Sequence, residues 1–323
     1  MARLIDAVIG HTQIIDSLFQ LKLQNRWPHA FLFVGPSAIG KKQVALAFAQ
    51  VLICENADTA CGNCGPCLRL AKLQSENLIF IEPDTSLVKP VIKVEAIRGV
   101  LESLSLASLH GSRVVIINDA HTMNPQAANT LLKTLEEPFE NVYFFLIGPD
   151  VHQFLPTIRS RTQVLQFNPL QVEDLRKIKP HLADWAYQAS HGQVDRLTQL
   201  TSSDGIEKRT EAFELLEHFF TDREFLMHTQ WRQQVKDKTW TLAAIAAWLQ
   251  LLSQSLKAKA LQQTSSSAVS IEHTKYFKML EVIASSRLID LSQSLVQAEK
   301  AILSNLDPVL IMENIWVTYA RVG

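Results

Sequence analysis

The first half of the chain alternates short apolar runs with amphipathic stretches. The apolar runs end at Gly, Pro, Asn or charged residues, as buried strands do, and they cover residues 30–34, 78–81, 113–117, 142–147 and 164–167. Helical spacing of apolar positions predicts helices over residues 14–23, 41–53, 95–106 and 124–137. Largely apolar strands separated by helices predict a parallel sheet that is covered on both faces.

The strand signal disappears from residue 170 onward. Residues 170–200 predict a few short helices with a break at His191-Gly192, and residues 202–205, Ser-Ser-Asp-Gly, are typical of a linker. The remainder, residues 207–323, has a helical pattern, interrupted by a serine-rich loop predicted at residues 262–270. An apolar stripe at helical spacing runs through Trp240, Ile245, Trp248, Leu249, Leu252 and Leu256. This half is therefore predicted to be a helical bundle with Trp and Leu in its core.

Composition narrows the class of protein. The chain has 323 residues, enough for two or three domains, and 47% of them are hydrophobic and 20% charged, an ordinary globular balance. The formal net charge of -1 argues against a self-sufficient nucleic-acid binder. The N-terminus lacks the pattern of a secretory signal, and the longest apolar stretch, residues 241–252, is shorter than the ~20 residues that span a membrane. We expect a soluble, cytoplasmic protein.

Residues 35–42 read Gly-Pro-Ser-Ala-Ile-Gly-Lys-Lys and lie between a predicted strand and a predicted helix, which is the context of a phosphate-binding P-loop. Gly35 and Gly40 let backbone N–H groups turn toward phosphate oxygens, and Lys41 would reach the β- and γ-phosphates. The next position usually carries Ser or Thr, whose hydroxyl binds Mg²⁺. Lys42 stands there instead, with no acceptor oxygen and an added positive charge. A simple tight turn is the alternative, which the flanking strand and helix disfavour.

A second strand of P-loop enzymes ends in an Asp that binds Mg²⁺, often beside an acid that polarises water. Here the strand at residues 114–117 is followed by Asn118 and Asp119. Asn118 is neutral and replaces a magnesium-binding carboxylate poorly. Asp119 is shorter than the Glu expected of an active motor. Together with Lys42, these residues predict weak or absent Mg²⁺-dependent ATP hydrolysis, although a plain strand cap has the same appearance.

All four cysteines lie within a short segment, at Cys54, Cys61, Cys64 and Cys67. Two-residue spacers let neighbouring thiolates converge on one tetrahedral Zn²⁺, and Gly62, Gly65 and Pro66 allow the tight turns. The alternative is a set of free thiols, which have no reason to cluster at this spacing. Since thiolates fill all four ligand places, the predicted zinc site is structural.

An arginine pair, Arg159 and Arg161, precedes the last predicted strand. In ring ATPases an arginine near a subunit edge can reach the γ-phosphate held by the next subunit, which is worth about 10³–10⁵ in rate in well-studied nucleotide hydrolases. On spacing alone, a solvated or salt-bridged arginine is the better interpretation.

Taken together, these motifs resemble the clamp-loader branch of the AAA+ proteins. The resemblance rests on the run Asn-Thr-Leu-Leu-Lys-Thr-Leu-Glu-Glu-Pro that ends at Pro138, on His29-Ala30, on the four-cysteine insert and on Ser160-Arg161, within about residues 8–200. It implies an α/β P-loop (AAA+) parallel-sheet domain, then a small helical lid, then an all-α collar that packs into a pentameric ring. The expected bounds are residues 1–167, with a zinc-binding insert at 54–67, then 168–206 and 207–323.

The resemblance also implies a function. Such a ring uses ATP to open a sliding clamp and load it on primer-template DNA. The expected partners are therefore the motor and clamp-opening subunits, the clamp and, through the complex, DNA, with no membrane. Arg161 would act in trans, completing the ATP site of the adjacent motor subunit. The chain itself is expected to hold structural zinc, to bind ATP and Mg²⁺ weakly or not at all, and to lack polymerase and ATPase activity.

The sequence departs from the motor subunits of that family at further positions beyond the magnesium site. Gly148-Pro149 stands where motors carry a polar residue that senses the γ-phosphate. Asp195, beside Arg196, stands where they carry a sensing arginine, in a register that can differ by one residue. Thr162 replaces the usual Cys after Arg161, which changes little because the arginine carries the chemistry.

Two other interpretations remain open at this point. Intact Gly40 and Lys41 favour an ATP-hydrolysing motor subunit of the same complex, against which Lys42 and Asn118 count. The cysteine cluster also fits a stand-alone zinc-containing DNA-binding protein, against which the near-neutral charge counts.

Overall fold

A computed structural model of the chain describes residues 3–56, 59–84, 89–106, 111–222, 224–260 and 274–320. Its contacts divide the chain into two compact units. The first comprises Met1–His181 with His191–Asp195, and the second Leu182–Ser190 with Arg196–Gly323. This division is coarser than the three domains expected from the sequence, which stay a prediction. The serine-rich loop predicted at residues 262–270 lies outside the described residues.

A five-stranded parallel sheet forms the centre of the first unit, in the order β2-β3-β4-β1-β5. Leu32 in the middle of β1 lies opposite Leu146 on one side and Val164 on the other. The predicted strands are confirmed to within one residue at each end. The strands are β1 (Ala30–Val34), β2 (Leu78–Ile81), β3 (Arg113–Ile117), β4 (Val142–Gly148) and β5 (Gln163–Gln166).

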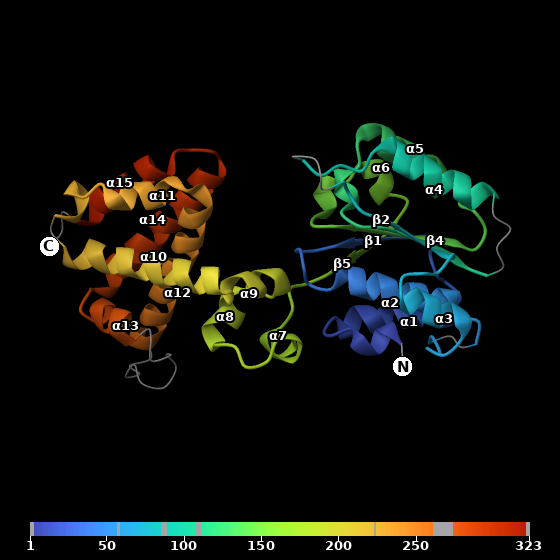
Figure 1. The fold of residues 1–323 in the computed structure, drawn as a ribbon, viewed down its shortest axis with the longest axis horizontal. Helices are drawn as coiled ribbons and strands as arrows, with labels where there is room; N and C mark the ends of the chain where they lie inside the picture. Colours follow the sequence, from blue (N-terminus) through green and yellow to red (C-terminus); the bar gives the residue numbers. More distant parts are fainter. Residues whose placement is uncertain are drawn as a thin grey trace. The chain divides into compact units, whose positions relative to one another are not determined.

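Helices cover both faces of this sheet (Figure 1). On one face α4 and α5 pack over the alternate residues Leu32, Val115 and Leu146, and α1, α2 and α3 lie on the other face. The helices of this unit are α1 (Thr12–Leu23), α2 (Lys41–Ile53), α3 (Gly65–Ala71), α4 (Val94–Leu106), α5 (Pro125–Glu136), α6 (Pro156–Arg159) and α7 (Val172–Ile178), with 3-10 turns η1 (Leu4–Ala7), η2 (Ala120–Thr122) and η3 (Val151–Gln153). The predicted parallel sheet with two covered faces is thus confirmed.

Aromatic packing is dense on the α2 face of the sheet. The Phe31 and Phe145 rings stack at 5.6 Å on neighbouring strands, and Phe33 meets Phe145 edge-on at 5.3 Å. Trp27 packs on Phe48 of α2 at 5.7 Å. Successive side chains of a strand point to opposite faces of the sheet, and helices cover both faces. These strands are therefore apolar at nearly every position.

The second unit is helical throughout its described residues. Trp248 and Trp316 are fully buried at its centre, and the Trp248 indole donates a hydrogen bond to the carbonyl of Ala212 at 2.6 Å. Trp240, Ile245 and Leu252 are also buried, so the predicted apolar stripe is confirmed as core. The helices are α8 (Asp184–Ala189), α9 (Val194–Leu200, which begins in the first unit), α10 (Ser203–Thr221), η4 (Phe225–Met227), α11 (Gln230–Lys236), α12 (Lys238–Ala260), α13 (Thr274–Glu281), α14 (Ser285–Leu303) and α15 (Pro308–Ala320).

The linker predicted at residues 202–205 is wrong. Ser202 is instead the N-cap of α10, where its hydroxyl accepts a hydrogen bond from the Gly205 amide at 3.1 Å. Ser, Asp and Gly are frequent in loops, but the same small polar residues are preferred at helix N-termini because they satisfy free amides there. The predicted break at His191-Gly192 is confirmed, with both residues at positive φ between α8 and α9.

None of the described helices combines the length and the apolar character that crossing a lipid bilayer requires.

The aromatic layer predicts a large loss of stability on truncation. Phe145 is completely buried, so Phe145→Ala should lower the free energy of unfolding by about 3–5 kcal/mol through lost burial and the cavity it leaves. Leu23→Ala is the control, since Leu23 is 63% exposed at the end of α1 and its truncation should change stability by no more than about 0.5 kcal/mol. Urea denaturation followed by circular dichroism measures both, and equal effects would contradict the packing described.

Candidate functional site

The loop between β1 and α2, where the P-loop was predicted, has a glycine at positive φ at each end. Gly35 leaves the strand with φ 149° and Gly40 enters the helix with φ 103°. A Cβ at Gly35 would lie 2.3 Å from the carbonyl oxygen of Phe167, so the close approach of the last strand excludes any side chain there. The predicted strand–loop–helix context is therefore present.

Lys41 turns its ammonium group back onto this loop. Its Nζ donates to the carbonyl oxygens of Gly35 and Pro36, both at 2.5 Å, and the residue is 7% exposed. Burial lowers the pKa of Lys41 to about 8, and the nearby Asp119 carboxylate partly offsets this shift. The Lys41 ammonium is thus bound by the carbonyl groups of its own loop.

Residues distant in sequence support the loop from outside. The His11 ring Nε2 donates to the Ile39 carbonyl at 2.6 Å, and the ring meets Phe167 edge-on at 4.9 Å. The Val194 amide donates to the Ala38 carbonyl at 3.0 Å. None of these contacts has a local sequence signature, and the sequence analysis did not find them.

An ion pair lies beside the loop, where the sequence analysis expected a degraded cation site. Lys42 Nζ lies 3.0 Å from Glu82 Oε1 and 4.3 Å above the Phe80 ring. The Asn118 amide donates to Glu82 at 3.5 Å and to Asp119 Oδ2 at 3.1 Å. The structure therefore joins Lys42, Asn118 and Asp119, as expected, and adds Glu82. Glu82 directly follows β2, whose end lies beside the end of β3, and this position could have identified it as a site residue from the sequence.

The position expected to lack a γ-phosphate sensor is closed to side chains. A Cβ at Gly148 would lie 2.5 Å from the ring of Phe154. His121 is close by, and its Nδ1 has no hydrogen-bond partner among the described residues. Burial lowers the pKa of His121, with Asp119 opposing and Lys41 reinforcing the shift. The Phe154 ring is apolar, whereas the His121 imidazole places a polar atom 3.7 Å from the position of a Cβ at residue 148.

The four cysteine sulfurs converge. Cys54 follows α2, Cys61 and Cys64 lie in the next loop, and Cys67 lies in α3, with all four Sγ atoms within 4.8 Å of one another. The amides of Asn63 and Cys64 donate to Cys61 Sγ at 3.4 and 3.3 Å and lower the pKa of that thiol to about 6. Burial raises the pKa of Cys67. These four thiol donors are arranged so that they could hold one metal ion. Helix α3, which begins within the cluster, was not predicted.

Arg161 follows α6 and precedes β5, an edge strand of the sheet. Its Nη2 lies 2.6 Å from Oε1 of Glu136, the last residue of α5. Its Nη1 donates to the Thr157 carbonyl at 3.0 Å and to the Ser160 hydroxyl at 3.2 Å. The side chain is 33% exposed. Sequence reasoning missed Glu136, whose role appears only in the tertiary structure.

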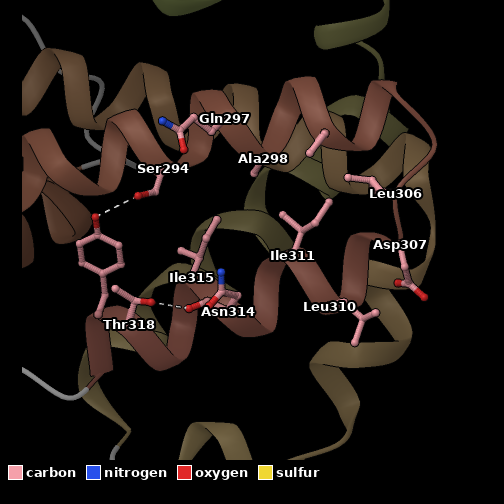
Figure 2. Close-up of a pocket in the computed structure, with 12 residues that line it drawn as sticks. Ser294, Gln297, Ala298, Leu306, Asp307, Leu310, Ile311, Asn314, Ile315 and Thr318 are labelled. Atoms are coloured by element: carbon pink, nitrogen blue, oxygen red, sulfur yellow. Dashed lines mark hydrogen bonds between the residues drawn. The ribbon is translucent and has the colours of Figure 1, made fainter.

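The second unit carries a groove of about 450 Å³ between α14 and α15 (Figure 2). Leu306 and Leu310 line it and are 58% and 67% exposed. A hydrogen bond of 3.0 Å between Ser294 and Tyr319 joins the two helices at one end. Polar side chains, among them Gln297, Asp307 and Asn314, line the rest of the groove, so its surface is mixed in character.

The sequence profile of one known family, described as DNA polymerase III, delta subunit, matches residues 10–171, about half of the chain. The chain belongs to this family. The matched segment includes the predicted P-loop, the cysteine cluster and Arg161. Residues 191–195, among them Val194 that supports the loop, lie outside the matched segment.

Two relatives carry the name DNA polymerase III subunit delta'. The protein from Bacillus subtilis is 29% identical over 70% of this chain and 71% of its own length. The protein from Pseudomonas aeruginosa is 39% identical over 41% of each chain, so this match spans less than half of that relative. Among solved structures, a DNA polymerase III gamma subunit-related protein from Thermotoga maritima aligns at 18% identity over 95% of this chain and 98% of its own, with a TM-score of 0.44.

The buried ammonium of Lys41 predicts a specific pH dependence of stability. Its pKa is about 8 when folded, against 10.5 without the protein environment. Between these values the unfolded chain binds the extra proton, so this residue makes stability rise with pH. Below pH 8 the penalty for burying the charge is fully present, and the gap corresponds to about 3 kcal/mol.

Lys41→Met removes this penalty. The stability of the variant minus that of the wild type should therefore fall by about 3 kcal/mol between pH 8 and pH 10.5. Urea denaturation at a series of pH values measures the difference. A difference that stays constant over this range would show that Lys41 is not buried as a charge.

Proposed function

We propose that this chain is a clamp-loader subunit of the bacterial replicative DNA polymerase III that does not hydrolyse ATP and supplies Arg161 to the ATP site of a neighbouring motor subunit. Family membership and the two delta' relatives support the clamp-loader role. The observation that carries the non-hydrolytic part is the Lys42–Glu82 ion pair of 3.0 Å.

This ion pair replaces the parts that hold magnesium. A working P-loop binds Mg²⁺ through a Ser or Thr hydroxyl and a carboxylate on a nearby strand. Here an ammonium group takes the hydroxyl position and pairs with a carboxylate, while the amide of Asn118 donates to the two nearby acids. An amide donor and an ammonium repel a cation that would approach the same oxygens. ATP with Mg²⁺ is therefore expected to bind weakly or not at all.

Arg161 is placed to act outside its own chain. It lies beside the edge strand of the sheet and remains partly exposed, although its own P-loop is bounded by β1 in the interior of the sheet. In the proposed ring its guanidinium would reach the γ-phosphate bound by the adjacent motor subunit. The residue stabilises charge that develops on the transferred phosphoryl group, which is the usual role of an arginine finger.

The remaining partners follow from this role. The ring, proposed to be pentameric, opens a sliding clamp and loads it on primer-template DNA, which this chain contacts through the complex. Residues 207–323 are proposed as the collar of the ring, and the groove formed by α14 and α15 supports this because it offers apolar side chains to a neighbouring subunit. The lid at residues 168–206 and the cytoplasmic location stay predictions.

A motor subunit of the same complex is the second candidate. The positive-φ glycines at both ends of the loop and the retained Lys41 favour it. Against it stand the Lys42–Glu82 pair and the closed position at Gly148.

We also propose that the cysteine cluster binds one structural Zn²⁺. Zn–S bonds of ~2.3 Å place the sulfurs of a tetrahedral site about 3.8 Å apart, and the four Sγ atoms already lie within 4.8 Å of one another. Backbone amides donate to Cys54 and Cys61, which stabilises thiolates. With four thiolates and no open position, the ion would link the end of α2 to α3.

The role of Arg161 can be tested in the assembled complex. Arg161→Ala should lower the clamp- and DNA-stimulated ATPase of the complex at least about tenfold at the adjacent site, since arginine fingers contribute 10³–10⁵ in rate. Arg161→Lys keeps the charge but loses the planar fork and should recover only part of the rate. Arg159→Ala, two residues earlier at the end of α6, is the matched control and should leave the rate within about twofold.

ATPase is measured after size-exclusion chromatography confirms assembly. An unchanged rate for an assembled Arg161→Ala complex would refute the proposed action in trans. Failure of the wild-type chain to join the complex would refute the clamp-loader role itself.

The zinc site predicts the metal content of the purified chain. Wild type should contain about one Zn²⁺ by elemental analysis, and Cys64→Ser should lose most of it because a neutral hydroxyl replaces one of four thiolates. Asn63→Ser, which changes the neighbouring residue but no sulfur, should keep the metal. Chelation should lower the melting temperature of wild type and leave that of Cys64→Ser unchanged. Wild-type protein without metal would contradict the assignment.

A further inference from the structure

Arg161 is fully engaged by its own chain on one side of its guanidinium. Glu136 lies 2.6 Å from Nη2, and the Thr157 carbonyl and the Ser160 hydroxyl accept from Nη1. A guanidinium binds a phosphate through the same fork of terminal N–H groups. The donors that a γ-phosphate would use are therefore occupied in the isolated chain.

The contacts of Arg161 with neutral oxygens and its contact with a carboxylate have different effects on the binding of a phosphate. Thr157 and Ser160 present neutral oxygens, which leave the charge of Arg161 available. Glu136 presents a full negative charge at the end of the guanidinium, so a bound phosphate would stand close to a like charge. Binding a phosphate therefore favours a state in which Glu136 has released Arg161.

Release is feasible because the ion pair is open to solvent. The side chains of Arg161 and Glu136 are 33% and 50% exposed. Exposed ion pairs bias an equilibrium by no more than about fivefold. Glu136 can thus hold Arg161 in place without preventing its use.

We propose that Glu136 is a positioning residue that acts as a latch on Arg161. It holds the guanidinium on its own chain while the subunit interface is open, and it gives way to the γ-phosphate of the neighbour when the interface closes. This inference rests on the proposed function of Arg161 in trans. Its consequence is a lower ATPase in the complex before the clamp and DNA are bound.

The test uses the complete clamp-loader complex assembled with variants of this chain. ATPase is measured with and without the clamp and primed DNA. Glu136→Gln keeps the size of the side chain but removes the charge, so it should raise the unstimulated rate by about two- to fivefold, the range of an exposed ion pair. The stimulated rate should change less, because the latch is already open in that state.

Two further variants separate the latch from a structural role. Glu137→Gln alters the next residue, which is also exposed, and should leave both rates unchanged. Glu136→Gln combined with Arg161→Ala should behave as Arg161→Ala alone, because the latch acts only through the arginine.

The outcomes distinguish this inference from the function on which it rests. If Arg161→Ala lowers ATPase but Glu136→Gln leaves the unstimulated rate unchanged or lowers it, the latch is refuted and the finger stands. If Arg161→Ala has no effect in an assembled complex, both are refuted. A Glu136→Gln chain that no longer assembles would also overturn the latch, since Glu136 would then be an interface contact.

Discussion

Parallel pairing of the strands is the constraint on which the candidate site depends. Because all strands of the sheet run in the same direction, their carboxyl ends meet at one edge. The P-loop after β1, Glu82 after β2 and Asn118 after β3 are brought to that edge by the fold alone. The same constraint applies in an active P-loop enzyme and in a chain that has lost the chemistry. Architecture and activity are therefore separable, and only the side chains at this edge distinguish them.

Those side chains pair with one another at this edge of the sheet. Lys42 forms an ion pair with Glu82. The amide of Asn118 donates to the carboxylates of Glu82 and Asp119, which would otherwise repel each other. Lys41 donates to the loop carbonyls, and the nearby Asp119 carboxylate offsets only part of the effect of burial on its pKa. Each charged group at this edge of the sheet therefore has a hydrogen-bond or ion-pair partner supplied by the chain itself.

Sequence periodicity was sufficient to predict the sheet, its direction and the helical second half, since these depend on local apolar patterns. It also predicted that Lys41, Lys42 and Asn118 lie close together, because the apolar runs show where each strand ends. His11, Glu82 and Glu136 were not found: each acts through a partner far away in the chain, at His11–Ile39, Lys42–Glu82 and Arg161–Glu136. Residues 202–205 were misread because the small polar residues of loops are also those of helix caps.

The ring of Phe154, which fills the space beside Gly148, has an evolutionary consequence. Changing residue 42 to Thr alone would supply one magnesium ligand, but Asn118 would remain an amide and a side chain at residue 148 would require the Phe154 ring to move. On the proposed function, each of these single changes leaves the magnesium site incomplete, so hydrolysis would not return in one step. If the proposed function is correct, the loss of ATP hydrolysis is therefore difficult to reverse. Descendants of this chain can diversify in how they contact their neighbours far more readily than they can regain a motor of their own.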